Sequence, residues 1–310
     1  MSARSLTRRR ATLVAAATSA ALILTGCGDD SDSGSSGGGG GDAAGSELPE
    51  VEVDEELAAL VPAEIAEDGV ISVGSDTTYA PSEFLDEDGE TIIGFDVDLF
   101  TLVAQKLGLE AEFESAPFDS IIAGVGSGRY EAGVSSFTIN PDRLAEATMV
   151  SYFNAGTQWA TREGNPDDVD PDNACGLSVA VQTGTIQVDD VTARSEACEA
   201  AGDDEIDIQQ FESQADATAA VASGRVDAVL ADSPVMAYAV QQTDGQLELL
   251  GDIYDSAPYG YVVPKEQTQF AEALQRALQA LIDEGAYDEV LSNWGVEDGA
   301  IDDPSVNPAS

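Results

Sequence analysis

Histidine is absent from all 310 residues of the chain. Because histidine is a frequent general base and a frequent metal ligand, its absence removes the Ser-His and Cys-His pairs of nucleophilic catalysis and a usual component of zinc sites. We therefore expect neither a bound metal nor a cofactor. Aspartate and glutamate remain available as acids and bases, which keeps an enzyme open as an alternative function.

Basic residues are scarce: Lys and Arg together number 12, against 59 Asp and Glu, and the formal net charge is −47. A chain this acidic would repel phosphates, which excludes nucleic acid as a partner. The acidity itself is typical of a well-solvated surface. The sequence also lacks the Gly-rich P-loop with its lysine, so we expect no nucleotide hydrolysis by this chain.

Only one apolar run is long, and it lies near the start of the chain. Residues 11–24 are apolar apart from three Ser and Thr residues, and they follow four arginines. A membrane-spanning anchor needs about 20 predominantly apolar residues, which favours an export signal over residues 1–26. The string Leu24-Thr25-Gly26-Cys27 resembles a bacterial lipobox, which implies cleavage before Cys27 and a lipid such as palmitate on its sulfur. We expect residues 27–60, which open with a Gly-rich stretch, to be a flexible tether.

Cysteine is rare, with three in the chain. If Cys27 is lipidated, Cys175 and Cys198 remain, and their spacing does not match a metal site. An exported protein permits a disulfide, which we expect between these two residues. Two buried free thiols are the alternative.

The chain contains an internal repeat. Residues 127–132 read SGRYEA, and residues 223–228, 96 positions later, read SGRVDA. In each copy Ser-Gly ends a helical run and a short apolar strand follows. Upstream, residues 71–76 resemble residues 177–182 in the same way. The repeat predicts an α/β fold built twice, as two similar lobes.

Four polar residues occupy equivalent strand ends in the two copies: Asp76, Ser136, Gln182 and Asp232. In open α/β sheets, ligands bind at the carboxyl ends of the strands. Two such sheets facing each other would bring these four positions to one cleft.

Arg143 and Asp232 suggest what the cleft binds. Arg143 follows Asn140 and Pro141, a typical helix N-cap and first helical residue, so its guanidinium would add a bidentate fork to the free N–H groups of a helix start. Asp232 ends a strand and could either cap the following helix or accept a ligand ammonium. A cation and an anion facing each other describe a site for a zwitterion.

Five segments occur in order along the chain: residues 74–81 (GSDTTYAP), 93–99 (IGFDVDL), 138–143 (TINPDR), 182–185 (QTGT) and 224–232 (GRVDAVLAD). Together they resemble the polar amino-acid-binding proteins of ABC importers, solute-binding protein family 3, over residues 70–295. The resemblance implies the type 2 periplasmic-binding-protein fold, with two α/β lobes joined by two hinge crossovers. Lobe 1 would comprise residues 61–158 and 259–310, and lobe 2 residues 159–258.

The resemblance also implies the roles of nine residues. Arg143 would hold the α-carboxylate of the ligand and Asp232 its α-ammonium. The other seven positions would line the pocket: Ser136, Thr138 and Thr185 around the carboxylate, Asp76 and Tyr79 toward the ligand side chain, and Ser135 and Gln182 on the walls. This chain departs from the family pattern at Ser82, where an aromatic residue is usual, so the ligand side chain stays open.

These observations favour a monomeric receptor, held by Cys27 on the outer face of the cytoplasmic membrane, that delivers an amino acid to a permease and its ATPase subunits. Arg143 is the only basic residue that we expect in the cleft. A polar neutral or basic amino acid is therefore expected ahead of an acidic one, whose second carboxylate would be buried unpaired. The alternatives are a ligand-binding sensor module, or an enzyme on the same fold, such as a dehydratase acting on a cyclic amino-acid precursor.

Overall fold

The computed structural model describes residues 48–309. The expected signal peptide, the lipidation site Cys27 and the first part of the expected tether lie outside the described residues. None of the helices in residues 48–309 is long and apolar enough to cross a membrane.

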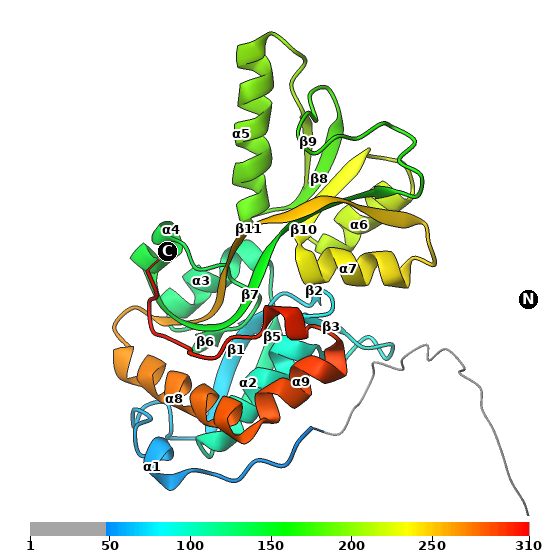
Figure 1. Cartoon of the computed structure of the whole chain (residues 1–310). Coiled ribbons are helices and arrows are strands. Elements are labelled where there is room, and N and C mark those ends of the chain that lie inside the picture. Colours follow the sequence, from blue (N-terminus) through cyan, green and yellow to red (C-terminus); the bar gives the residue numbers. More distant parts are fainter. Residues whose placement is uncertain (1–47, 310) are drawn as a thin grey trace, which may run out of the picture. The chain divides into compact units, whose positions relative to one another are not determined.

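One eight-stranded sheet runs through both lobes (Figure 1). Its strand order is β5 (Glu110–Ser115), β1 (Val70–Ser75), β6 (Ala132–Gly133), β11 (Leu247–Pro264), β7 (Ala147–Arg162), β10 (Ala228–Asp232), β8 (Ser178–Gln182) and β9 (Asp207–Phe211). β1 pairs in parallel with β5 and β6 at one end, and β8 with β9 and β10 at the other. The two parallel groups are the two copies predicted from the repeat.

β7 and β11 join the lobes, and both strands extend well beyond the lobe boundaries expected at residues 158–159 and 258–259. They pair with each other antiparallel almost from end to end, with register shifts between Leu250 and Tyr254, between Tyr254 and Ala257, and between Tyr259 and Gly260. The sequence suggested two separate sheets. The structure differs because paired crossover strands satisfy each other's backbone groups and so carry the hydrogen-bonded ladder from one lobe into the other.

Lobe 1 contains the larger apolar core, formed around β1, β5 and β6 by the helices α2 (Phe95–Lys106), α8 (Thr268–Glu284) and α9 (Ala286–Trp294). A smaller apolar cluster forms on the other face of its strands under α3 (Phe118–Gly126) and α4 (Pro141–Glu146). One face of α8 packs in this core, with Phe270, Leu274 and Leu278 fully buried. A three-stranded antiparallel sheet of β2 (Thr78–Tyr79), β3 (Glu83–Leu85) and β4 (Ile92–Ile93) leads from β1 into α2.

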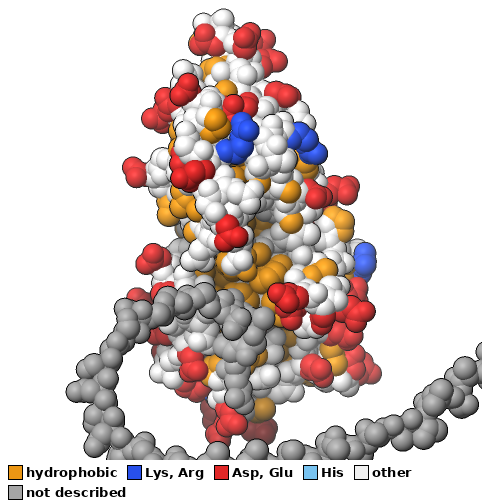
Figure 2. Space-filling view, turned by 90° about the vertical axis from the view of Figure 1, so that its right-hand side faces the viewer, with side chains coloured by type: hydrophobic (Ala, Val, Ile, Leu, Met, Phe, Trp, Pro, Cys, Tyr) orange, Lys and Arg blue, Asp and Glu red, His pale blue; other side chains and the backbone are white. Residues whose placement is uncertain are grey.

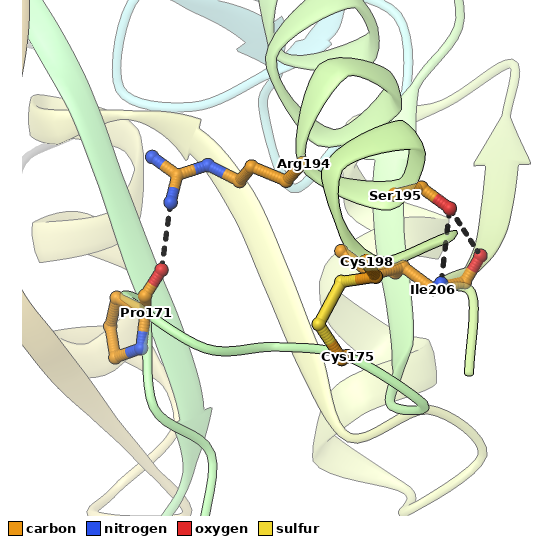
Figure 3. The surroundings of a disulfide bond; sticks show 6 residues. All are labelled: Pro171, Cys175, Arg194, Ser195, Cys198 and Ile206. Atoms are coloured by element: carbon orange, nitrogen blue, oxygen red, sulfur yellow. Dashed lines mark hydrogen bonds between the residues drawn. A yellow bond between two sulfur atoms is a disulfide. The ribbon is translucent and has the colours of Figure 1, made fainter. Parts of the chain in front are cut away.

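Lobe 2 places α5 (Ile186–Ala201), α6 (Gln214–Ala222) and α7 (Ser233–Gln242) around β8, β9 and β10. Cys175 and Cys198 form a disulfide, as expected, which ties the segment before β8 to the last turn of α5 (Figure 3). Arg194, one turn before Cys198, donates to the carbonyl of Pro171 on the same segment at 2.8 Å. The bridge therefore fastens one side of lobe 2 internally.

The segment before β1 packs on lobe 1, so the expected tether over residues 27–60 is wrong for its last part. α1 (Glu55–Ala58) is capped by the Asp54 carboxylate, which accepts from the backbone N–H groups of Glu56 and Leu57. Four apolar side chains pack against the lobe 1 core: Leu48, Val51, Leu57 and Leu60. Apolar residues at this spacing bury area on the core, which a Gly-rich stretch does not. The chain's other end, after the 3-10 helix η1 (Glu297–Gly299), returns to β7 through a bridge between Val150 and Val306.

Loss of the disulfide should destabilise the protein without disabling its site. For a sequence separation of 23 residues, a Cys175→Ser/Cys198→Ser variant should lose about 3 kcal/mol of the free energy of unfolding. Urea unfolding followed by fluorescence measures this loss. Reductant should lower the midpoint of the wild type and leave that of the double variant where it is; a wild-type midpoint indifferent to reductant would contradict a stabilising bridge.

Candidate functional site

A small cavity lies where the two lobes meet. It is lined from lobe 1 by Tyr79, Phe118, Ser136, Thr138 and Arg143, and from lobe 2 by Thr185, Ile186, Gln187 and Asp232. Its volume of about 10 Å³ is the space of roughly one water molecule. A larger hollow of about 320 Å³ lies between α7 and α9 and has Asp298 as its only charged lining residue. The small cavity is the candidate site, because it holds charges of both signs.

Arg143 is positioned by the predicted helix start. Asn140 caps α4 by accepting from the backbone N–H of Arg143 at 2.8 Å, and Pro141 is the first helical residue, both as expected. The guanidinium donates to the carbonyls of Thr138 at 2.8 Å and Gly184 at 3.2 Å. These two bonds leave further N–H groups of the fork for a ligand.

Two aromatic rings pack against the guanidinium of Arg143. Phe118 and Phe137 stack with centroids 4.7 Å apart, and the Arg143 guanidinium carbon lies 5.3 Å from the first ring centroid and 5.5 Å from the second. Burial lowers the pKa of Arg143, and the negative charge of Asp232 opposes that shift. The cation is thus held by packing and by carbonyl dipoles, and no described carboxylate forms an ion pair with it.

Asp232 is the acidic group of the cavity and ends β10. It is the N-cap residue of α7, but its side chain makes no capping hydrogen bond. Its carboxylate instead accepts from Tyr79 Oη at 2.9 Å, Tyr259 Oη at 2.8 Å and Gln187 Nε2 at 2.8 Å. Burial raises its pKa, while these donors and the charge of Arg143 lower it. Of the two roles open to Asp232 from the sequence, the geometry therefore favours an acceptor aimed into the cavity over a helix cap.

Asp76 directly follows β1, and its carboxylate is occupied by donors. One oxygen accepts from the N–H of Thr78 at 3.0 Å and from its hydroxyl at 2.6 Å; the other accepts from Phe118 N at 3.1 Å and Gln182 Nε2 at 2.8 Å. Asp76 is absent from the cavity lining, and it holds the start of α3. Burial raises its pKa. A role for Asp76 in reading the ligand side chain stays a prediction.

The remaining predicted residues divide into lining and supporting positions. Ser136, Thr138 and Thr185 line the cavity. Ser135 lies behind it, where its hydroxyl accepts from Asp76 N at 3.0 Å and donates to Glu83 at 2.8 Å. Gln182 is also outside the lining, but its carboxamide oxygen is buried without a hydrogen-bond partner among the described residues. That oxygen could therefore accept a hydrogen bond from a ligand.

Sequence reasoning missed four residues of the site: Phe118, Ile186, Gln187 and Tyr259. Phe118 supports Arg143, while Gln187 and Tyr259 donate to Asp232. Ile186 and Gln187 could have been found from their place in the first turn of the helix that Thr185 begins. No motif signals Phe118 or Tyr259, because each reaches the site through tertiary packing.

The lobes touch directly around the cavity. Two hydrogen bonds between the lobes are described above, from Tyr79 to Asp232 and from Arg143 to Gly184. In a third, Gln182 of lobe 2 donates to Asp76 of lobe 1. In a fourth, the Gln214 N–H donates to the Thr78 hydroxyl at 3.1 Å. A solute held between Arg143 and Asp232 would therefore contact both lobes. No cluster of three or more Asp, Glu or Cys in residues 48–309 is arranged to hold a metal ion.

Two α/β lobes joined by paired strands, with a cation and an anion facing one cavity between them, define a two-lobed solute-binding protein. The sequence pattern of the bacterial extracellular solute-binding proteins, family 3, matches residues 71–297, and the chain belongs to this family.

Three similar proteins bear on the solute. The chain is 39% identical over 253 residues to the arginine-binding protein ArgT of Corynebacterium glutamicum, covering 81% of this chain and 83% of the relative. A solved structure of an ancestral arginine-binding protein bound to arginine superposes with a TM-score of 0.67 at 30% identity, over 73% of this chain and 98% of the other. A third, an ancestral amino acid-binding protein described as a precursor of cyclohexadienyl dehydratase, gives 0.65 at 30% identity, over 74% and 97%.

Removing either charge should weaken the binding of an amino-acid zwitterion. Hydrogen bonds to charged groups contribute about 1.5–3 kcal/mol, so Arg143→Met and Asp232→Asn should each lower affinity at least tenfold in titration calorimetry. Arg225→Met is the matched control, because Arg225 is exposed and lies over Phe211, away from the cavity. Wild-type affinity in the Arg143 or Asp232 variant would remove that residue from the site.

Proposed function

We propose that this protein captures arginine outside the cytoplasm and delivers it to the permease and ATPase subunits of an ABC importer. The single observation that carries the proposal is the pair Arg143 and Asp232, which lines one cavity from opposite lobes. Arg143 would bind the α-carboxylate and Asp232 the α-ammonium of the amino acid. Membership of a solute-binding family supports the same role.

Arginine is favoured over other amino acids by the acceptors around the cavity. A guanidinium offers five N–H donors and needs acceptors. Gln182 presents a buried oxygen without a donor, and Asp76 is a carboxylate beside it. An acidic ligand would need a second cation, whereas Arg143 is the only basic residue in the described lining. The 39% identical relative is named as an arginine-binding protein.

The electrostatic field of the protein suits a cationic solute. Acidic side chains are spread over both lobes, and basic ones are few, on the face that Figure 2 shows. Asp119 is exposed beside Gly184, where a Cβ added at Gly184 would lie 2.8 Å from the Asp119 Cβ. Such a field raises the rate at which a cation is captured, and salt weakens the effect.

Anchoring of Cys27 by a lipid on the outer face of the membrane and action as a monomer are parts of the same proposal. The anchoring is supported by the lipobox-like string and by the family's description as extracellular. We also propose that the protein binds its solute without converting it, although one similar structure is described as a precursor of a dehydratase. Mass spectrometry should recover arginine unchanged after incubation with the protein.

A thermal-shift and calorimetry screen against the twenty amino acids tests the choice of ligand. Arginine should give the largest rise in melting temperature. A ligand at 100 times its dissociation constant adds about 2.7 kcal/mol to the free energy of unfolding, which such a screen detects. Glutamine is expected next. Glutamate or aspartate as the tightest ligand would overturn the assignment.

Removal of the Asp76 charge should reduce the preference for a cationic side chain. Asp76→Asn keeps one acceptor oxygen, which can still accept from the Phe118 N–H at the start of α3 and from Gln182 Nε2, so α3 should remain in place. Its amide nitrogen replaces the oxygen that accepts from Thr78, whose hydroxyl can turn and accept. The fold-loss in arginine affinity should be about ten times the fold-loss in glutamine affinity, because only arginine loses a charge-assisted hydrogen bond from its side chain. Asp119→Asn removes an exposed carboxylate beside Gly184, outside the cavity lining, and is the control for the long-range electrostatic field. Equal losses for the two ligands in Asp76→Asn would exclude a role in side-chain selection.

A further inference from the structure

Two carboxyl groups lie buried directly behind the cavity wall and make no ion pair with a described residue. Glu83 belongs to β3 and Asp96 to the first turn of α2, and each has 0% of its surface exposed. Neither lines the cavity. A buried carboxylate without a cation is costly, so the pair needs an explanation that the charges of Arg143 and Asp232 do not give.

Close packing of two backbone segments brings these carboxyl groups together. The N–H of Phe95 donates to the Pro81 carbonyl at 3.1 Å, and that of Asp96 to the Ser82 carbonyl at 3.0 Å. Gly94, with φ of 139°, permits this approach, since a Cβ there would lie 2.0 Å from the Ser82 carbonyl oxygen. Any other residue at position 94 would push Glu83 and Asp96 apart.

The hydrogen bonds of the pair account for all four oxygens only if a proton is present. Glu83 Oε1 accepts from the Ser135 hydroxyl at 2.8 Å; Asp96 Oδ2 accepts from Ser136 N at 2.9 Å and from the Tyr152 hydroxyl. Glu83 Oε2 and Asp96 Oδ1 are buried and accept from no donor in the described residues. Ionised carboxylates only accept, so these two oxygens can bond to each other only if one of the two groups carries a proton.

We propose that Glu83 and Asp96 share one proton and together act as positioning residues that hold Ser135 and Ser136 against the ligand cavity. Ser136 lines the cavity, and its φ of 51° lies in the left-handed region, which a serine adopts at a cost. The bonds from Ser136 N and Ser135 Oγ to the pair hold the strained turn. The effect on binding rests on the proposed function of the cavity, whereas the shared proton does not.

Among the described residues, the titratable groups that face the pair are tyrosines and one carboxyl group, and none of them is a cation. Tyr152 from β7 donates to Asp96, and Tyr261 from β11 stacks on its ring at 4.1 Å. Asp76 lies beyond Ser135, and Tyr79 comes from β2. Burial, then the charge of Asp96, raises the pKa of Glu83 well above its usual value, and burial raises the pKa of Asp96 to about 6.

The sign of the pH dependence follows from these directions. Both folded-state pKa values are higher than the unfolded ones of about 4, so the folded protein binds more protons. The stabilising contribution is complete below about pH 4 and is lost as pH rises toward the folded-state values. While one proton is retained on folding, the unfolding equilibrium constant rises by up to about tenfold per pH unit.

The first test measures unfolding by urea from pH 5 to pH 8 in the full chain and in Glu83→Gln. A glutamine amide can donate to Asp96 and accept from Ser135 as a protonated Glu83 does. Above about pH 6, where only the shared proton is retained on folding, the ratio of the wild-type unfolding constant to that of the variant should rise by up to about tenfold per pH unit. Glu87→Gln removes an exposed carboxylate of the same hairpin and should run parallel to the wild type. A Glu83→Gln profile that is also parallel would refute the shared proton.

The second test measures arginine binding by calorimetry at pH 7. Glu83→Leu leaves Asp96 Oδ1 without a partner and removes the acceptor of the Ser135 hydroxyl, so affinity should fall about tenfold, and Glu83→Gln should restore most of it. Equal losses in both variants would refute the positioning role. If Glu83→Leu does not fold, the binding test rests on Glu83→Gln, whose affinity should stay close to that of the wild type. Asp96→Asn, whose amide can donate to Glu83, is a second variant for the unfolding test and should also remove the pH-dependent slope. A wild type that fails to bind arginine would refute the proposed function and leave the unfolding test decisive for the pair.

Discussion

The antiparallel pairing of β7 with β11 is the constraint on which the rest of the structure depends. Each strand passes through both lobes, so each lobe is attached to the same ladder. β7 supplies Tyr152 beneath the carboxyl pair, and β11 supplies Tyr259 to Asp232. The two strands therefore fix the spacing between the cation and the anion of the site through backbone hydrogen bonds, which are insensitive to side-chain substitution.

The site also shows how a very acidic protein manages its own charge. The negative electrostatic field of the protein favours the capture of cations, and the Asp232 carboxylate must remain ionised and unpaired to accept a ligand ammonium. Three neutral donors solvate it, two of them tyrosine hydroxyls. Arg143 is likewise held by carbonyls and rings and not by a carboxylate. Neither charge is neutralised by a direct partner, so both remain available to a zwitterion, with preorganised dipoles taking the place of water.

The sequence was most informative where local chemistry decides the structure. Asn140 and Pro141 signalled a helix start, and the repeat placed Gln182 and Asp232 at strand ends; the structure has all of these. The two-lobed fold followed from the same signals. Where geometry depends on tertiary contacts, sequence reasoning failed. It extended the tether through Leu57 and Leu60, because the core that buries them comes from the other end of the chain. It missed Tyr259, whose direction depends on strand register.

The register shifts in β11 have a consequence for how the site can change. Successive side chains of a strand point to opposite faces, so each added residue in one strand of a pair reverses the faces of everything beyond it. The pairing is irregular at three places between Leu250 and Gly260: β11 has two extra residues before Tyr254 and one before Ala257, and β7 has one extra residue opposite the step from Tyr259 to Gly260. Deleting one residue there would turn Tyr259 from Asp232 and present a neighbour, Pro258 or Gly260, while the ladder on either side kept its bonds. Insertions or deletions in the paired crossover strands, as well as substitutions in the pocket, are thus a route by which the solute specificity of this fold could change.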